Sequence, residues 1–507
     1  MTKAQICIMI SIVVYLAMVL IVGVVFSRKT KNVGDFYLGG RKLGPLVTAM
    51  SAEASDMSSY LLMGLPGLAY LSGVADVGWT AIGLAIGTYL NWLIVAKRLR
   101  NYSANIGAIT IPDYFSLRYR DNKNVLMCIA AVVIIVFFVP YTASGFAACG
   151  KLFGTLFGID YHIAMIISAI IIVGYTSLGG FTAASVTDLI QSIIMTVALV
   201  CVLVFGVAQA GGMGAVIENA QALPGYFSLT ETYAADTGTS EPYGLLRIVS
   251  TLAWGLGYFG MPHILLRFMA IENPEKVKFS RRVASVWVVI SMGIAILIGV
   301  VGLGMVNEGV LAPLDDSETI IIQISDFMSQ FGVLPALLAG VILAGILAST
   351  MSTADSQLLA ASSAASENIL GGMFRLKLSE TSKMVVARVT LVVISVIGVI
   401  IAWDSNSSVF GIVSFAWAGF GAAFGPVILL SLFWKRSNKY GAIAGMLAGG
   451  VMVFVWKYAI AGLADILNIY ELLPAFVIGL VVNVVVSLLT PAPEKEIDKE
   501  FETAKSK

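Results

Sequence analysis

The sequence predicts an all-α polytopic membrane protein with about thirteen transmembrane helices. Three observations lead to this fold class: the composition, the recurrence of long apolar stretches, and the way that charge is confined between them. Hydrophobic residues make up 58% of the 507 positions and charged residues only 12%, about half the roughly 25% of ordinary soluble domains. A water-soluble surface cannot be built from this composition, so we expect residues 1–507 to form a single membrane transport domain surrounded by lipid.

The predicted spans are apolar stretches of about 20 residues between charge or turn clusters. They cover residues 5–27, 44–70, 78–96, 125–147, 161–178, 188–209, 246–266, 284–305, 333–358, 385–403, 408–433, 441–460 and 471–490. The first run is too long for a signal-peptide core and is followed at once by Arg28 and Lys29 instead of a small-residue cleavage site. We expect it to remain as a permanent helix.

Basic residues predict the orientation. With this set of spans, the loops on one side of the membrane, Arg267 included, hold all but four of the 31 Lys and Arg residues; the exceptions are Lys3, Lys151, Arg247 and Lys457. The positive-inside rule then places the N-terminus outside and the C-terminus, with the tail of residues 491–507, in the cytoplasm of a cell whose inner (plasma) membrane holds the protein. The basic residues form no continuous face, so we expect no nucleic-acid partner.

Two predicted helices carry residues that break a helix. The second contains Ala54-Ser-Asp-Met-Ser-Ser59 followed by Gly64-Leu-Pro-Gly67, and the seventh contains Trp254-Gly-Leu-Gly-Tyr-Phe-Gly-Met-Pro262. Isolated glycines in membrane helices usually serve close packing. Runs of this kind instead favour an unwound backbone that lines a cavity or binds a ligand, and paired breaks are typical of a transporter site.

The spacing of the breaks predicts an inverted repeat. They lie five spans apart, and because five is odd, two five-helix sets would enter the membrane with opposite orientation. This gives one repeat over residues 44–209 and another over 246–433. Residues 5–27 then form an extra first helix, and residues 441–490 form two further helices.

Hydroxyl side chains line one face of the ninth predicted helix. Ser349, Ser352, Thr353 and Ser356 recur at i, i+3, i+4 and i+7, which places them on the same side. One interpretation is hydrogen bonding between helices. The other is a cation site, because hydroxyls and the carbonyls of an unwound helix supply the oxygen ligands that a dehydrated monovalent ion needs.

Acidic residues within the spans add candidates for an ion path. A carboxylate such as Asp56 inside a spanning segment is costly and by default marks an ion or substrate path. Glu53, one turn away, is compatible with a protonated side chain, one that faces a cavity, or one that faces lipid headgroups. Asp188 follows Thr187 where the sixth span is predicted to begin, so helix capping and a role in ion release are equally weighted.

The remaining residues bear on the class of function. Neither His162 nor His263 lies in a metal-ligand pattern, and no acid, base and nucleophile set converges, so we expect neither a cofactor nor an enzyme. An ion channel would favour repeated filter elements, whereas this chain has one pair of unlike breaks. A secondary transporter is favoured, with a substrate pocket near the aromatic residues Tyr141, Trp254 and Tyr258, which sit beside Gly or Pro.

Several segments carry a resemblance to a known family. They are Tyr37-Leu-Gly-Gly-Arg41, Ala54–Ser58 with Leu61–Gly67, Trp254–Gly260 with Pro262-His263, Met351-Ser-Thr353 and Ala416–Pro426. On these segments the chain resembles the sodium/solute symporter family, and most closely the bacterial sodium/proline symporters. The resemblance implies a leucine-transporter-like core of two inverted five-helix repeats, and import of a small amino acid, L-proline, coupled to sodium by alternating access. The alternatives are another small amino acid or a carboxylate as the substrate, and, less favoured, an ion channel.

The resemblance also implies site residues. Sodium would bind the carbonyls of Ala54, Met57 and Ser349 and the hydroxyls of Ser352 and Thr353, and Asp56 and Asp188 match positions for sodium coupling or release. The proline pocket would be lined by Ser58, Tyr141, Trp254, Tyr258 and Pro262. This chain departs from the proline symporters near that pocket, because Glu53, Ser59 and Tyr60 stand where Gly, Gly and Trp are usual and Met261 replaces Gln. The departures bear on the substrate more than on the ion.

Overall fold

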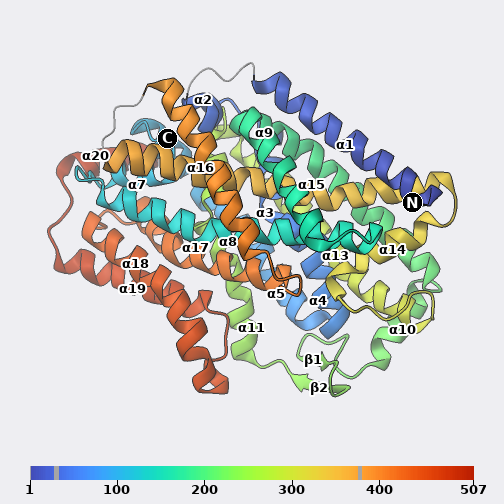
Figure 1. Cartoon of the computed structure of the whole chain (residues 1–507). Coiled ribbons are helices and arrows are strands. Elements are labelled where there is room, and N and C mark those ends of the chain that lie inside the picture. Colours follow the sequence, from blue (N-terminus) through green and yellow to red (C-terminus); the bar gives the residue numbers. More distant parts are fainter. Residues whose placement is uncertain (1, 28–32, 375–378, 507) are drawn as a thin grey trace.

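The protein is almost entirely helical, as the sequence predicts (Figure 1). The computed structural model describes residues 2–27, 33–374 and 379–506. Within these residues, ten helices are long and apolar enough to cross a membrane, and Tyr161–Gly174 and Leu245–Phe259 are shorter apolar helices. Each of the predicted spans overlaps a helix. The all-α fold class is confirmed, whereas the count of thirteen crossings stays a prediction.

The first part of the described chain ends with α10, before a polar segment. Its elements are α1 (Lys3–Ser27), α2 (Val33–Leu38), η1 (Gly39–Arg41), α3 (Pro45–Ser59), the π-helical η2 (Tyr60–Gly64), α4 (Leu65–Ser72), α5 (Val74–Leu90), the π-helical η3 (Asn91–Val95), α6 (Ala96–Asn105), α7 (Ile111–Arg118), α8 (Val125–Phe157), α9 (Tyr161–Gln209) and α10 (Met213–Ala222).

The second part begins with a two-stranded antiparallel hairpin that the sequence analysis did not predict. Its elements are β1 (Glu231–Ala234), β2 (Thr239–Pro242), α11 (Leu245–Leu252), η4 (Ala253–Phe259), α12 (Pro262–Ala270), η5 (Pro274–Lys276), α13 (Val277–Asn307), η6 (Ser317–Thr319), α14 (Ile320–Ser329), α15 (Val333–Ser363), η7 (Ala364–Met373), α16 (Glu380–Ile401), α17 (Val409–Phe433), α18 (Lys439–Val455), η8 (Trp456–Ile460), η9 (Ala461–Leu463), η10 (Asp465–Leu467), α19 (Leu472–Leu489) and α20 (Lys495–Ser506).

Both predicted helix breaks are confirmed. Between α3 and η2, Ser58 has φ 48° and ψ −167°, a conformation that non-glycine residues rarely adopt. In the second break, the 3₁₀ helix η4 is followed by an extended Met261 before α12 starts at Pro262. The backbone of η4 also lies directly against α5, because a Cβ added at Gly87 would stand 2.3 Å from the carbonyl oxygen of Gly255. Glycine at these positions allows the unwound segment to approach its neighbour.

The boundary between the fifth and sixth predicted spans is wrong. Residues Tyr161–Gln209 form one long helix, α9, whose only non-helical residue is Gly180, with φ 63° and ψ −173°. The helix therefore resumes after Gly180 and not at residue 188. Asp188 lies in the helix interior, and the interpretation of Asp188 as a helix cap is wrong.

Helix α15 forms the centre of the molecule. It packs against α1, α3, α8 and α9, and nearly every side chain between Ala336 and Ser363 is buried. In this central position α15 packs directly against the broken helix α3.

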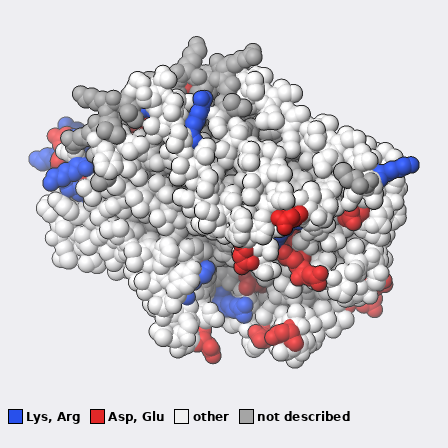
Figure 2. All heavy atoms as spheres, in the orientation of Figure 1, with Lys and Arg blue, Asp and Glu red and all other residues white. Residues whose placement is uncertain are grey.

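The two ends of the molecule differ in charge. Figure 1 shows the N-terminus and the C-terminus at opposite ends, and on the face drawn in Figure 2 most acidic residues gather at the end with α10 and the hairpin, whereas basic residues gather near α20. Arg28, Lys29, Lys31, Arg375, Lys377 and Lys507, which are among the predicted cytoplasmic basic residues, lie outside the described residues. The predicted tail contains the helix α20, which packs on α6.

Candidate functional site

The predicted sodium ligands of α3 and α15 lie in contact. Ser352 Oγ donates to the carbonyl oxygen of Ala54 at 2.8 Å and to that of Ser349 at 3.1 Å, and Thr353 Oγ1 donates to the Ser349 carbonyl at 3.1 Å. The fifth group, the Met57 carbonyl, accepts from the backbone N–H of Tyr60 across the break. Because the break at Ser58 interrupts the helical ladder, the carbonyls in the last turn of α3 are open to groups from other helices.

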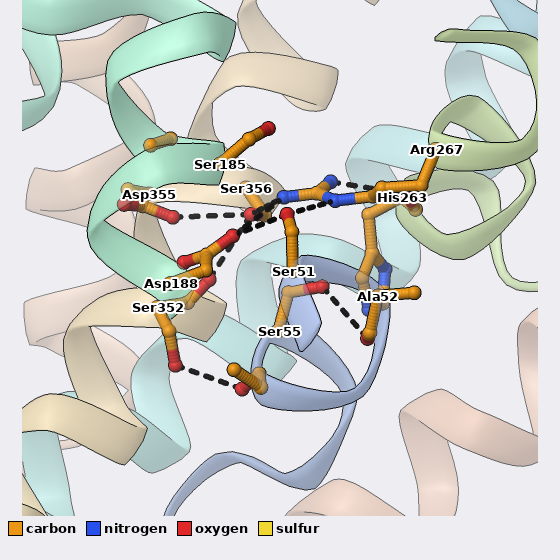
Figure 3. A network of polar contacts seen from close by, with 12 residues as sticks. Ser51, Ala52, Ser55, Ser185, Asp188, His263, Arg267, Ser352, Asp355 and Ser356 are labelled. Atoms are coloured by element: carbon orange, nitrogen blue, oxygen red, sulfur yellow. Dashed lines mark hydrogen bonds and ion pairs between the residues drawn. The ribbon is translucent and has the colours of Figure 1, made fainter. Parts of the chain in front are cut away.

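A buried ion-pair network lies beside these ligands (Figure 3). Asp188 Oδ2 accepts from Ser51 Oγ at 2.6 Å and from Arg267 Nη2 at 3.2 Å. Arg267 also donates to Ser51 Oγ at 2.9 Å, to Ser356 Oγ at 2.6 Å and to the His263 carbonyl at 3.0 Å. Both charged side chains are fully buried. The network joins α3, α9, α12 and α15. Arg267 links Asp188 to Ser356, which belongs to the hydroxyl face of α15.

One expectation about this network is corrected. Arg267 is not in a cytoplasmic loop: it lies within α12, and its guanidinium is buried against Asp188. The hydroxyl face of α15 is divided, since Ser352 and Thr353 reach backbone carbonyls whereas Ser356 accepts a hydrogen bond from Arg267. Ser349 contributes its carbonyl, and its hydroxyl donates back to Ile346 within α15.

Asp355 is a residue that the sequence analysis missed. It is fully buried on α15, and its Oδ1 accepts from Ser356 Oγ at 3.0 Å (Figure 3). The signal was present, because a carboxylate in an apolar spanning helix is the same feature that identified Asp56.

The predicted pocket residues fall into two groups. Tyr258 Oη donates to Asp56 Oδ2 at 2.5 Å and Tyr141 Oη donates to the Asp56 carbonyl at 3.1 Å, so both tyrosines meet at the broken end of α3. Ser58 Oγ, in the break itself, accepts from the Tyr60 N–H at 3.1 Å. Pro262 lines a cavity together with Tyr37, Arg267 and Ser356.

Aromatic side chains cover the break on its other side. The Trp254 ring stacks on Tyr60 with the ring centroids 5.6 Å apart and on Tyr470 at 5.0 Å. Trp417 Nε1 donates to the Trp254 carbonyl at 2.7 Å, which fixes the backbone of η4. Tyr60, one of the departures from the proline symporters, is therefore part of the same cluster as the predicted pocket residue Trp254.

Glu53 is buried within the protein. Its side chain is 1% exposed and its Oε1 accepts from Trp92 Nε1 at 3.0 Å. The alternative in which Glu53 faces lipid headgroups is wrong, because such a residue would be exposed on the outside of the helix bundle.

Known proteins match the chain over nearly its whole length. The model of the "Sodium:solute symporter family" matches residues 36–449. The high-affinity proline transporter PutP of Bacillus subtilis is 41% identical over 95% of this chain and 98% of its own length, and the sodium/proline symporter of Haemophilus influenzae is 41% identical over 98% of this chain and 97% of its own. The osmoregulated proline transporter OpuE of Bacillus subtilis is 39% identical over 96% of both chains.

Solved structures show the fold. A Na⁺-coupled sialic acid symporter in its substrate-bound outward-open state superposes with a TM-score of 0.79 at 19% identity, covering 96% of this chain and 99% of that chain. Mhp1, a nucleobase-cation-symport-1 family transporter in a closed conformation, superposes with a TM-score of 0.57 at 14% identity, covering 92% and 98%. At these identities the likeness concerns the fold alone.

The family match and the curated relatives place the function of the chain in membrane transport and not in enzymatic catalysis. We conclude that this multi-pass membrane protein belongs to the sodium:solute symporter family.

Proposed function

We propose that the protein imports L-proline together with sodium by alternating access. The observation that carries the proposal is the contact of the Ser352 hydroxyl on α15 with the Ala54 carbonyl at the break in α3. It joins the two proposed repeats at the point where the resemblance expects sodium. The relatives named as proline transporters or sodium/proline symporters, which match over nearly the full chain, support the choice of substrate.

The proposed sodium ligands are the carbonyl oxygens of Ala54, Met57 and Ser349 and the hydroxyl oxygens of Ser352 and Thr353. All are neutral and hard, which suits a dehydrated monovalent cation. The two hydroxyls donate to carbonyls of the same set, and a hydroxyl can rotate its hydrogen away and offer a lone pair to an ion instead. The donor set therefore fits sodium.

Coupling between ion and substrate follows from the position of Asp56. Ala54 and Met57 flank Asp56 on α3, so an ion that binds their carbonyls also fixes the break at Ser58. The same Asp56 holds Tyr258 and Tyr141, which we propose to line the substrate pocket with Ser58, Trp254 and Pro262. Sodium thus favours the arrangement of the pocket that binds substrate, and by linkage the substrate favours sodium binding.

Asp188 is proposed to act in sodium release. It lies on α9 and accepts from Ser51 of α3, and it shares the Arg267 guanidinium with Ser356, which is one turn from Ser352. Movement of α3 or α12 away from α9 would free the Asp188 carboxylate. A freed carboxylate next to the sodium ligands attracts a departing cation toward the cytoplasmic side.

The topology is part of the same proposal. We place the N-terminus outside and the C-terminus in the cytoplasm of the inner (plasma) membrane, with inverted repeats over residues 44–209 and 246–433, one extra helix before them and two after. The opposite placement of the chain ends in Figure 1 supports an odd number of crossings.

A different substrate of the same size is the second candidate. The Tyr60 ring stacks on Trp254, and its buried hydroxyl has no hydrogen-bond partner among the described residues. A polar hydroxyl at this place favours a small amino acid or carboxylate with a group that can bond to it.

Competition for uptake separates the two candidates. Purified protein in proteoliposomes would take up radiolabelled L-proline under an inward sodium gradient, in the presence of an unlabelled panel of small amino acids, hydroxylated prolines and carboxylates. The proposal expects L-proline to compete better than leucine, glutamate or glucose. If another solute of the panel competes more strongly than L-proline, that solute becomes the proposed substrate. If none of these solutes is taken up in a saturable way, the proposed function is contradicted.

A further inference from the structure

Tyr470 comes from a part of the chain outside the two proposed repeats, and it contacts a residue of the proposed substrate pocket. It follows the 3₁₀ helix η10 and precedes α19, in the segment that joins α18 to α19. Its ring lies nearly parallel to the indole of Trp254, with 20° between the ring planes and 5.0 Å between the ring centroids. The last two helices therefore contribute to the wall around Trp254.

Two hydrogen bonds hold Tyr470 in this position. Its backbone N–H donates to Ser250 Oγ at 2.7 Å, and its Oη donates to the Ser414 carbonyl at 2.8 Å. Ser250 belongs to α11, which leads into η4 and lies beside the end of the α18–α19 hairpin (Figure 1), and Ser414 belongs to α17. Because the backbone and the far end of the ring are both fixed, the ring gives Trp254 a preorganised surface on which to stack.

The residues next to Tyr470 fix the same segment. Leu472, the first residue of α19, packs against α17 and η4: a Cβ added at Gly421 would stand 2.7 Å from Leu472 Cδ1 and 2.9 Å from the Cα of Gly257. A glycine at 421 therefore allows the three elements to meet. On the other side, Glu471 Oε1 lies 3.6 Å from Lys457 Nζ at the end of the same hairpin. The segment is thus anchored on both sides of the stacked ring.

The orientation of the Trp254 indole depends on the rings that pack against it. Trp417 Nε1 donates to the Trp254 carbonyl, which holds the backbone but not the side chain. The indole itself contacts Tyr60 at 5.6 Å with 28° between the planes, Phe410 at 5.6 Å with 49°, and Tyr470 at the shortest of the three centroid distances. The ring from outside the repeats is therefore a main support of the indole.

We propose that Tyr470 is a positioning residue of the substrate pocket. It holds the Trp254 indole in the orientation that binds the substrate, and it acts through this indole and not through the ion ligands. In the proposed topology the segment between α18 and α19 lies outside the membrane, so it closes the pocket on the side from which the substrate arrives. This inference deepens the proposed function, on which it rests.

The KM for substrate in the Tyr470→Ala variant tests the proposal. In proteoliposomes, with the solute that competes best as the substrate, loss of the aromatic pair should raise the KM by about three- to tenfold. The maximal rate, and the sodium dependence at saturating substrate, should stay close to parental. Tyr470→Phe keeps the ring and loses only the bond to Ser414, so its KM should lie closer to the parental value. The matched control is Tyr458→Ala on the same hairpin, whose ring is 73% exposed and contacts Phe415 instead of Trp254; its KM should be parental.

A double variant shows whether Tyr470 acts through Trp254. When Trp254→Ala is already present, Tyr470→Ala should raise the KM no further, because the ring that it positions is gone. Two independent, additive effects would overturn the inference.

The remaining outcomes separate this inference from the proposed function. If the KM of Tyr470→Ala stays parental, whatever its maximal rate, the inference is wrong and the proposed function is unaffected. If the parental chain takes up no solute in a saturable way, the proposed function fails, and the positioning role fails with it. Should Tyr470→Ala not fold, Tyr470→Leu, which keeps a large apolar side chain without a ring, decides by the same change in KM.

Discussion

Replacing Ser352 by Ala removes one of five proposed sodium ligands and a side-chain hydrogen bond from α15 to the Ala54 carbonyl. In the structure, Ser352 Oγ reaches the Ala54 carbonyl at 2.8 Å and the Ser349 carbonyl at 3.1 Å, and the side chain is fully buried. Because this position is buried, water cannot readily supply an oxygen in place of the lost hydroxyl. Losing one hydrogen-bonding group that faces a charge costs about 1.5 to 3 kcal/mol. Since 1.4 kcal/mol is tenfold, the sodium concentration for half-maximal uptake should rise roughly ten- to a hundredfold.

The assay is initial uptake of substrate as a function of sodium concentration, in proteoliposomes with equal amounts of each variant. At saturating sodium, the KM for substrate should change much less, because the hydroxyl contacts the ion and not the solute. Ser349→Ala is the matched control: its hydroxyl donates back to Ile346 in its own helix, and only its carbonyl, which the substitution keeps, is a proposed ligand. Thr353→Ala should behave like Ser352→Ala, and Thr353→Ser, which keeps the oxygen, should be milder.

Two results would refute this reasoning. If Ser352→Ala and Thr353→Ala reach the membrane normally and keep the parental sodium dependence, these hydroxyls serve only helix packing. If Ser349→Ala is as impaired as Ser352→Ala, the effect comes from loosening α15 in general and says nothing about an ion ligand.

Four further predictions concern the contacts around the site and the orientation of the chain. Arg267→Gln should lower the thermal midpoint of the purified protein more than the double variant with Asp188→Asn, because an unpaired buried charge costs about 3–5 kcal/mol; a single variant as stable as the double one would contradict the ion pair. Tyr258→Phe removes the donor to Asp56 and should raise the half-maximal concentrations of both sodium and substrate by about tenfold or more, whereas a change in only one of them would argue against coupling through this bond. Trp254→Ala should raise the KM for substrate while leaving sodium dependence at saturating substrate close to parental, as measured by uptake, and an altered sodium dependence alone would remove this tryptophan from the substrate pocket. Tags at the two chain ends should be accessible from opposite sides of intact cells, the N-terminal tag from outside, and accessibility from the same side would require an even number of crossings.

Features with a local chemical cause were predictable from the sequence. The breaks near Ser58 and Met261 are predictable because Gly, Pro and clustered hydroxyl residues within an apolar span indicate an interrupted helix. The hydroxyl face of α15 was found because the helical period maps sequence spacing onto one side of a helix. The contact between Ser352 and Ala54 could be anticipated only through the family resemblance, since it joins residues that are far apart in the chain.

Features set by long-range contacts were missed or misassigned. Arg267 was placed in a loop because hydropathy treats an arginine as the end of a span, and only the fold reveals Asp188 as its buried partner. The Thr-Asp pair at 187–188 resembles a helix start, and it took the φ of Gly180 to show where α9 is interrupted. The hairpin of β1 and β2 and the helix α20 lie in polar segments, where periodic apolar patterns are too short to predict an element.

The most direct test of the central claim is accumulation of radiolabelled L-proline in proteoliposomes against its own gradient. An inward sodium gradient should drive the internal concentration transiently above the external one, a potassium gradient of the same size should not, and a sodium ionophore should abolish the effect. Accumulation that is equal with potassium, or equilibration without accumulation when sodium is present, would contradict sodium-coupled proline symport by this protein.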